Sequence, residues 1–177
     1  MEHISILVID DEPAVLETLT SFLGTLHSFT CVPVTSAEEA ISELKEQSFD
    51  LILSDVRMEG TDGYELLSIL RREHPEIPVI LITGGPYDYD AGIALGAKDF
   101  IRKPLNLVAL KARIHLVLQN ARLMNELQEK NRALEGSNRR LREERDYLVR
   151  LVDSWLTQGV DDSETRTLLT EILMALK

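Results

Sequence analysis

Short, continuous apolar runs constrain the fold of this chain more than any other feature of its sequence. A strand with one face in water alternates apolar and polar residues, whereas a continuous apolar run indicates a strand that is covered on both faces. Such strands are typical of a parallel sheet packed between two layers of helices. The runs are ISILVI (4–9), DLILS (50–54), PVILIT (78–83) and KDFIRKP (98–104), with a weaker one, FTCVPV (29–34), between the first two.

Segments with helical spacing lie between these runs. Their apolar residues recur every three or four positions, which places them on one face of a helix. Because strand and helix alternate about five times, the sequence predicts an open α/β sheet. The predicted helical faces are formed by Val15, Leu16, Leu19, Phe22, Leu23 and Leu26, by Ala37, Ala40, Ile41 and Leu44, and by Leu66, Leu67 and Leu70.

Charge, cysteine content and hydropathy exclude several classes of function. Residues 1–110 carry 19 acidic and 7 basic side chains, so this part would repel nucleic acid. Cys31 is the only cysteine, which excludes an internal disulfide and a thiolate metal cluster. No signal peptide is recognisable, and no apolar run approaches the roughly 18 residues that span a bilayer. We therefore predict a cytoplasmic protein without a membrane or nucleic-acid partner.

A leucine repeat follows the last apolar run. Leu127, Leu134, Leu141 and Leu148 are seven residues apart, which predicts the d positions of a coiled coil and hence a homodimer. A long helix that folds back on the preceding domain is the alternative. Gly136 lowers helix propensity and predicts a bend or fraying there. The corresponding a positions are Met124, Asn131, Asn138, Arg145 and Val152, and an asparagine at position a favours two parallel strands.

A further amphipathic helix is predicted at the end of the chain. Asp162 or Ser163 would cap it, and its broad apolar face needs a partner, either the preceding helix or a second chain. The expected organisation is therefore a domain over 1–118, a coiled-coil helix over 119–156 that continues its last helix, and a linker with a terminal amphipathic helix over 157–177.

Polar residues follow the apolar runs at the points where ligands bind in open α/β sheets, the carboxyl ends of the strands. Each of them also has a local explanation: an acidic residue before Pro13 could cap a helix, and a lone lysine could be a solvated charge. Coincidence of several such residues at one sheet edge favours a functional site. The residues are Asp10, Asp11 and Glu12, then Asp55, Thr83 and Lys103.

Crowded carboxylates repel one another unless a cation neutralises them, and an all-oxygen site suits Mg²⁺ or Mn²⁺. With such an ion present, Asp55 could attack a phosphoryl group and form an aspartyl phosphate. Lys103 would offer a positive charge to a phosphoryl oxygen, and the hydroxyl of Thr83 a directional contact.

The segments ILVIDDEP, DLILSDVRMEGTDGYELL, PVILITG and GAKDFIRKP, in this order and spacing, resemble the receiver domain of bacterial two-component response regulators (CheY-like) over Ile4 to about Leu118. The resemblance implies a five-stranded, doubly wound, flavodoxin-like parallel sheet and a sensor histidine kinase as partner. It implies phosphorylation of Asp55, no catalytic residues for turnover, a cis Lys103–Pro104 bond and a switch that moves Thr83 and turns Phe100 inward. The implied metal ligands are Asp10, Asp11, Asp55 and the backbone carbonyl of Arg57, and the implied phosphoryl contacts are Thr83 and Lys103.

Two departures from the family pattern stand out. Glu59 replaces the usual proline, which frees the backbone and predicts a looser loop after Asp55. GGPYDYDAG (84–92) is a poor helix start, so the fourth helix should be short or irregular. Because the family generally signals through its fourth and fifth helices, an altered partner face is expected, and exposure of Tyr87 and Tyr89 would support it.

The function expected from these features is that of a phosphoacceptor in a phosphorelay, with output through coiled-coil dimerisation or an unknown downstream protein. The main alternative is the receiver part of a longer regulator with an enzymatic output domain. A phosphatase or phosphotransferase with an aspartyl nucleophile is disfavoured, because Arg57 stands where such enzymes place a second Asp. A DNA-binding zipper is disfavoured because the arginines of NRRLREERD (138–146) alternate with glutamates.

Overall fold

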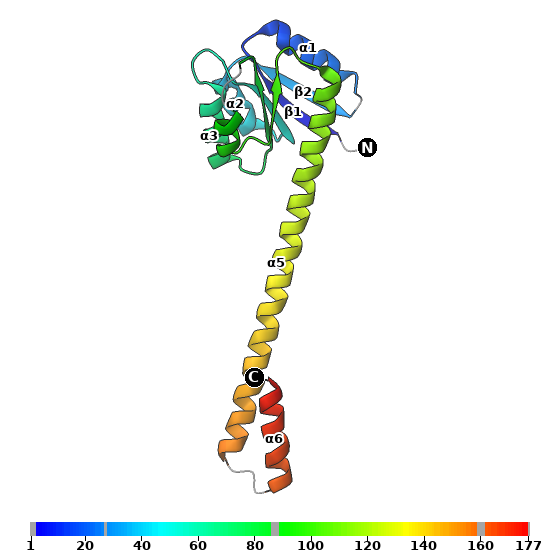
Figure 1. The fold of residues 1–177 in the computed structure, drawn as a ribbon. Coiled ribbons are helices and arrows are strands. Elements are labelled where there is room, and N and C mark those ends of the chain that lie inside the picture. The colour runs from blue at the N-terminus through cyan, green and yellow to red at the C-terminus, as the bar shows by residue number, and fades with distance from the viewer. Residues whose placement is uncertain (1–2, 27, 86–88, 159–161, 177) are drawn as a thin grey trace. The chain divides into compact units, whose positions relative to one another are not determined.

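The structure is a computed structural model that describes residues 3–26, 28–85, 89–158 and 162–176 (Figure 1). It divides into two compact units, residues 1–123 and residues 124–177. None of the described helices is long and apolar enough to cross a membrane.

The first unit is built on a five-stranded parallel sheet with the strand order β2-β1-β3-β4-β5. The predicted α/β fold with a doubly wound sheet is thereby confirmed. Lys103, which the sequence placed within the last strand, lies just after it. The strands are β1 (Ile4–Ile9), β2 (Phe29–Val34), β3 (Leu51–Asp55), β4 (Val79–Thr83) and β5 (Asp99–Arg102).

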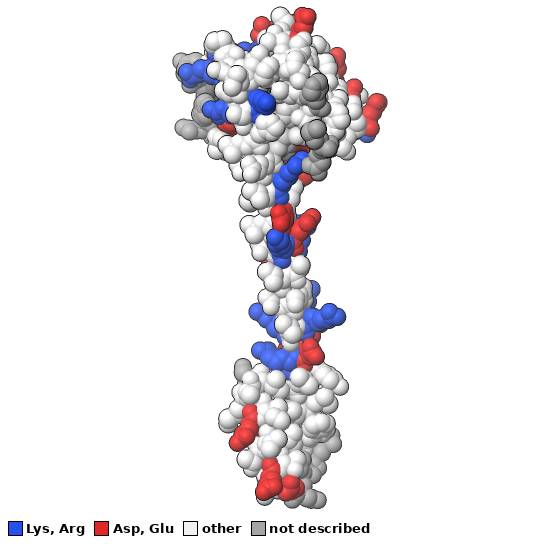
Figure 2. Space-filling view, turned by 90° about the vertical axis from the view of Figure 1, so that its right-hand side faces the viewer, with Lys and Arg blue, Asp and Glu red and all other residues white. Residues whose placement is uncertain are grey.

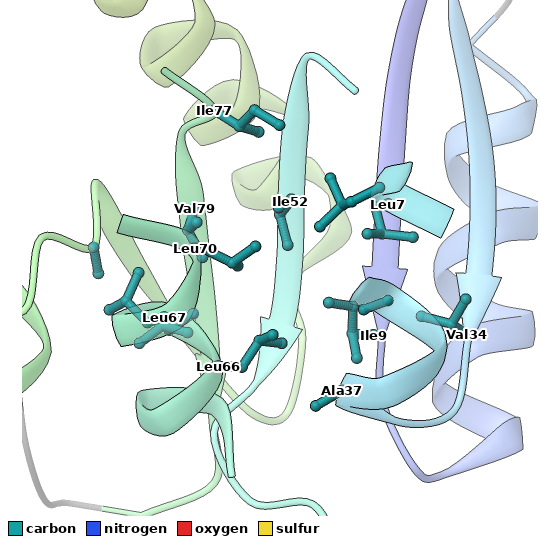
Figure 3. Close-up of a cluster of buried hydrophobic side chains, with 14 of the residues drawn as sticks. Leu7, Ile9, Val34, Ala37, Ile52, Leu66, Leu67, Leu70, Ile77 and Val79 are labelled. Carbon is teal, nitrogen blue, oxygen red and sulfur yellow. The ribbon is translucent and has the colours of Figure 1, made fainter. Parts of the chain in front are cut away.

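Helices cover both faces of this sheet, which explains the continuous apolar runs. Successive residues of β1 alternate between the two hydrophobic cores: Leu7 and Ile9 belong to the cluster that includes α2 and α3 (Figure 3), and Ile6 and Val8 belong to the cluster that includes α1 and the start of α5. The helices are α1 (Pro13–Gly24), α2 (Ala37–Glu46), α3 (Gly63–Glu73), α4 (Tyr89–Ala94) and α5 (Leu107–Gln158).

Local signals account for the helix starts near the carboxyl edge of the sheet. Pro13 occupies the first turn of α1, while Glu12 is the N-cap and makes no side-chain capping bond. Asp62 caps α3 by accepting hydrogen bonds from the backbone N–H groups of Tyr64 and Glu65, at 2.9 and 2.8 Å. The N-cap of α1 is thus Glu12 and not Asp11, so Asp10 and Asp11 are available to the site.

The fourth and fifth helices agree with the sequence pattern in length. α4 has six residues, in line with the predicted short helix. α5 runs for 52 residues without interruption, so the last helix of the sheet domain does continue into the leucine repeat. Gly136 causes no break, because a single glycine in a long helix costs only about 1 kcal/mol relative to alanine. Leu127, Leu134 and Leu141 are 53%, 61% and 59% exposed, so within the described chain this stripe is not covered.

The second unit ends in a helical hairpin. α6 (Ser163–Leu176) is capped by Asp162, whose carboxylate accepts the backbone N–H of Thr165 at 3.1 Å, and it lies alongside the end of α5 (Figure 1). Val152 is only 5% exposed. The preceding helix is thus one partner of the terminal amphipathic helix, and Val152, which the heptad pattern assigned to the coiled-coil seam, is instead covered within the chain. On α6 itself, Leu168 and Met174 remain exposed.

Candidate functional site

The carboxyl ends of four strands bring the predicted polar residues together. Asp10 follows β1, Asp55 ends β3, Thr83 ends β4 and Lys103 follows the residue that ends β5. Asp10, Asp55 and Thr83 are 0%, 4% and 5% exposed, although polar groups are rarely buried without partners. The sheet therefore gathers a buried polar cluster at one edge.

Three carboxylates form the centre of this cluster. Asp10, Asp11 and Asp55 each offer an oxygen, and these oxygens lie within 4.8 Å of one another. One oxygen of each residue accepts a backbone hydrogen bond: Oδ1 of Asp10 from Glu12 at 2.9 Å, Oδ1 of Asp55 from Val56 at 2.8 Å, and Oδ2 of Asp11 from Glu59 at 3.1 Å. Backbone donors thus orient all three side chains.

Lys103 bridges the acidic groups. Its Nζ lies 3.0 Å from Oδ2 of Asp10, 3.0 Å from Oδ2 of Asp55 and 3.1 Å from Oε1 of Glu12. Burial by itself would lower the pKa of Lys103, but the hydrogen bonds to Asp55, Asp10 and Glu12 outweigh it and raise the pKa above its ordinary value. The ammonium therefore stays charged, and the peptide bond that follows it, Lys103–Pro104, is cis as the resemblance implied.

A single lysine does not satisfy this many carboxylates. Burial raises the pKa of Asp10, even though the N–H of Glu12 and the charge of Lys103 both lower it. The ion-pair contact of Oδ2 of Asp10 with Lys103 is short, but that oxygen receives no well-aligned hydrogen bond from the described residues. A buried carboxylate oxygen whose polar contact among the described residues is one shared ammonium, beside two further carboxylates, is a group that a hard divalent cation would satisfy, so the donor set fits Mg²⁺ or Mn²⁺.

Thr83 and Arg57 flank the carboxylates. The hydroxyl of Thr83 accepts a hydrogen bond from the N–H of Gly85 at 3.3 Å, so its own hydrogen can point to another acceptor. Arg57 lies between the buried residues Val56 and Met58 in the loop after β3, and its side chain is exposed. Both positions are therefore placed beside Asp55 by the ends of β3 and β4.

Phe100 in β5 is almost fully buried, at 1% exposure. Its ring lies so close to Gly92 of α4 that a Cβ atom on residue 92 would collide with Cζ of Phe100. The same Cβ atom would also lie 3.0 Å from Cε1 of Tyr64. The inward position of the Phe100 ring thus depends on the missing side chain at residue 92. Neither the role of Gly92 nor its contact was predicted from the sequence.

Two contacts of the site escaped the sequence pattern. The pairing of Glu12 with Lys103 joins residues 91 positions apart, and the bond from Glu59 to Asp11 joins residues 48 positions apart. The replacement of proline by Glu59 was the available signal for the second contact, because proline has no N–H to donate. Tyr87 and the side chain of Tyr89, from which a partner face was to be judged, lie outside the described residues.

Comparison with known proteins identifies the class. Residues 6–115 match the family of response regulator receiver domains. The chain therefore belongs to the receiver domains of two-component response regulators.

Relatives and solved structures agree with this assignment. The transcriptional regulatory protein YvrH of Bacillus subtilis (strain 168) is 38% identical over 67% of this chain and 51% of its own length. A probable cyclic di-GMP phosphodiesterase of Vibrio cholerae is 33% identical over 76% of this chain and 31% of its own length. The crystal structure of NtrX from Brucella abortus in complex with ADP has a TM-score of 0.67 at 28% identity, covering 71% of this chain and 29% of that one. The chain thus spans about half or less of the length of these proteins.

Proposed function

We propose that this protein is a phosphoacceptor of a two-component phosphorelay and that Asp55 is the residue that receives the phosphoryl group from a sensor histidine kinase. The single observation that supports this most strongly is the convergence of three carboxylates within 4.8 Å and the placement of Lys103 3.0 Å from Asp55. Membership of the receiver family gives the phosphorelay as the setting.

The reaction proposed for Asp55 is an in-line displacement at phosphorus. A carboxylate oxygen of Asp55 forms a bond to phosphorus while the phosphorus–nitrogen bond of the phosphohistidine breaks, and the histidine nitrogen leaves with the bonding electron pair. Oδ1 of Asp55 is held by the N–H of Val56, whereas Oδ2 contacts Lys103. After transfer, the ammonium of Lys103 and the hydroxyl of Thr83 would contact the phosphoryl oxygens.

Asp10, Asp11, Asp55 and the backbone carbonyl of Arg57 would hold the metal, Mg²⁺ or Mn²⁺. When bound, the ion would supply positive charge that offsets repulsion between the carboxylates and the incoming phosphoryl group. Burial of the Asp10 carboxylate, which raises its pKa, supports this assignment, because a cation would compensate the lost hydration of that group. We propose that the domain is a phosphoacceptor and not an enzyme, with at most slow self-dephosphorylation of its own.

Thr83 and Phe100 would couple the phosphorylated site to the surface of the domain. Thr83 ends β4, and Phe100 lies in the neighbouring strand β5, where Leu81 is its register partner. Because Phe100 has no hydroxyl, a change in its position would be governed by packing against Gly92 and within the core cluster that Tyr64 borders.

The output proposed for the protein is homodimerisation through α5 or binding of a downstream protein by the second unit. The proposed division is a receiver over 1–118, a coiled coil over 119–156 and a terminal segment over 157–177. The exposed leucines of α5 recur every seven residues, and only another helix winding alongside can cover such a stripe along its length. A second copy of the chain presents the same stripe, with Asn131 and Asn138 opposite their own copies in a parallel pair.

Treatment with a small acyl phosphate and Mg²⁺ tests the proposal. The parent should gain the mass of one phosphoryl group in intact-protein mass spectrometry, and Asp55→Asn should not. Sedimentation of both proteins before and after treatment shows whether phosphorylation changes the oligomeric state. An unchanged mass of the parent contradicts the phosphoacceptor function, and a monomer in every condition contradicts the homodimer.

A further inference from the structure

We infer that the backbone N–H of Glu59 is a positioning group for Asp11 and raises the affinity of the carboxylate cluster for its divalent cation. This inference rests on the metal site of the proposed function and adds a residue to it that lies outside the set of ligands. It assigns a specific consequence to the replacement of proline at position 59.

The geometry singles out Asp11 as the carboxylate that needs such support. Asp10 and Asp55 are buried by the surrounding packing, whereas Asp11 is exposed in the bend between β1 and α1. Oδ2 of Asp11 accepts the N–H of Glu59 at 3.1 Å. A side chain at the surface populates several rotamers unless a hydrogen bond selects one, so this contact restricts where the carboxylate points.

The donor is itself held in place by the loop after β3. The N–H of Gly63 donates to the carbonyl of Val56 at 2.9 Å, which closes the loop. Met58 is buried in the core on the α2 and α3 side of the sheet, and the hydroxyl of Thr61 contacts Glu38 of α2 at 3.2 Å. Glu59 lies between Met58 and Thr61, and the contacts of these two residues restrict the position of its N–H.

Proline at position 59 would keep this loop but lose the contact. Gly60 has a φ of 83°, a value that type II turns require at their third residue, and proline is common at the second residue of such turns. Proline at position 59 is compatible with that pattern, yet proline carries no N–H. A chain with proline there has a stiff loop, whereas this chain has a loop that donates to a metal ligand.

Hydrogen bonds to metal ligands orient those ligands, and their loss typically lowers metal affinity by about tenfold or more. A charged acceptor also makes this hydrogen bond stronger than a neutral one. We therefore expect the N–H of Glu59 to strengthen binding of the cation by roughly tenfold. The carboxylate of Glu59 adds negative charge near the site and can also change the affinity for the cation. The experiment must distinguish this effect from that of the N–H.

The experiment compares Glu59→Pro with Glu59→Ala, because both remove the carboxylate and only the first removes the N–H. Mn²⁺ affinity is measured by the electron paramagnetic resonance signal of the free ion. Glu59→Pro should bind Mn²⁺ roughly tenfold more weakly than Glu59→Ala. Equal affinities of the two variants overturn the inference, whereas failure of the parent to bind Mn²⁺ overturns the proposed metal site itself.

A second measurement tests the bond without any metal and without a proline. Hydrogen exchange of the residue 59 amide, followed by NMR in the metal-free protein, should be faster in Asp11→Ala than in the parent. Equal exchange rates in the two proteins show that the contact is absent in solution and overturn the inference, even if Glu59→Pro should fail to fold.

Discussion

The leucines packed between the sheet and its helices lie in a different environment from the leucines of the seven-residue repeat on α5. In the first unit, Leu53, Leu66 and Leu67 are fully buried between the sheet and its helices. In the second unit, Leu134 and Leu141, which belong to the seven-residue repeat, are more than half exposed. The leucines between the sheet and its helices contact apolar side chains of the same chain, whereas the stripe on α5 is not covered by any of the described residues. Core leucines of the first unit are buried, whereas Leu116 and Leu123 of the same unit and the leucine stripe of the second unit are exposed.

Charged residues differ between the units in the same way. In the first unit, Asp10, Asp55 and Lys103 converge in a buried cluster. Along α5, basic and acidic side chains alternate on the surface (Figure 2), and pairs such as Lys130 with Glu126 at 2.7 Å are exposed. Each exposed ion pair contributes at most about 1 kcal/mol to stability. The charged side chains of α5 are therefore mainly solvated, whereas those of the first unit's cluster contact one another in a buried site.

The largest effect is expected from truncating a buried leucine. Leu67→Ala should lower the free energy of unfolding by about 3 kcal/mol, because it removes a fully buried side chain and leaves a cavity between α3 and the sheet (Figure 3). Leu134→Ala, the matched change on the exposed stripe, should change it by no more than about 0.5 kcal/mol in dilute protein. Urea unfolding of both variants measures the difference, and equal losses would remove the contrast between the units.

The stripe on α5 should matter for association. Leu134→Glu combined with Leu141→Glu should weaken the dimer at least about 100-fold, because two apolar contacts are lost and like charges meet at the seam. Ala133→Glu, a neighbouring exposed position outside the seam, is the control. Analytical ultracentrifugation over a range of concentrations reports the dissociation constant. Equal association of the seam and control variants would show that the stripe faces something other than a second copy.

Two helical glycines provide a third test. Gly92→Ala should destabilise the protein by about 2 kcal/mol, because the added methyl group collides with the ring of Phe100. Gly136→Ala on α5 meets no atom within 4 Å and should stabilise the helix by up to about 1 kcal/mol. In a Phe100→Ala background, the cost of Gly92→Ala should fall, although the close approach to Tyr64 remains. If the cost is unchanged there, the ring of Phe100 is not what limits position 92.

The smallest effect concerns the buried carboxylate. The raised pKa of Asp10 means that its ionised form is less stable in the folded protein than in the unfolded chain. Asp10→Asn should therefore stabilise the metal-free protein by about 1 kcal/mol at neutral pH. The gain should shrink as the pH falls through the raised pKa, where the parent carboxyl becomes protonated.

Thermal unfolding measures the stabilities of the parent and of Asp10→Asn, and added Mg²⁺ should reverse their order. The parent should be stabilised by Mg²⁺ according to the ratio of ion concentration to dissociation constant, and Asp10→Asn should respond less. A parent that is more stable than Asp10→Asn without metal would contradict the desolvation argument.

The pattern of the sequence predicted the fold and several of the side chains that converge at the edge of the sheet. Continuous apolar runs predicted strands covered on both faces, and residues at the ends of those runs predicted which side chains meet. Asp10, Asp55 and Thr83 could be found in this way because parallel strands deliver their carboxyl ends to one edge. The length of α5 and the short α4 were likewise predicted from local composition.

Contacts between loops could not be predicted by the same reasoning. Glu12 reaches Lys103, and the N–H of Glu59 reaches Asp11, although no periodicity links these positions. Gly92 could be read only as a poor helix former until the ring of Phe100 was seen against it. The heptad pattern also assigned Val152 to a seam between chains, but this residue is already buried within the single chain.

The sequence by itself determined the order of strands and helices, the carboxylates at the sheet edge and the leucine stripe, because each follows from spacing along the chain. Only the tertiary structure decided which loop donates to Asp11, what limits Phe100 and that Val152 is buried within the chain. These depend on side chains from distant segments meeting at atomic distances, and such distances are set by packing and not by local pattern.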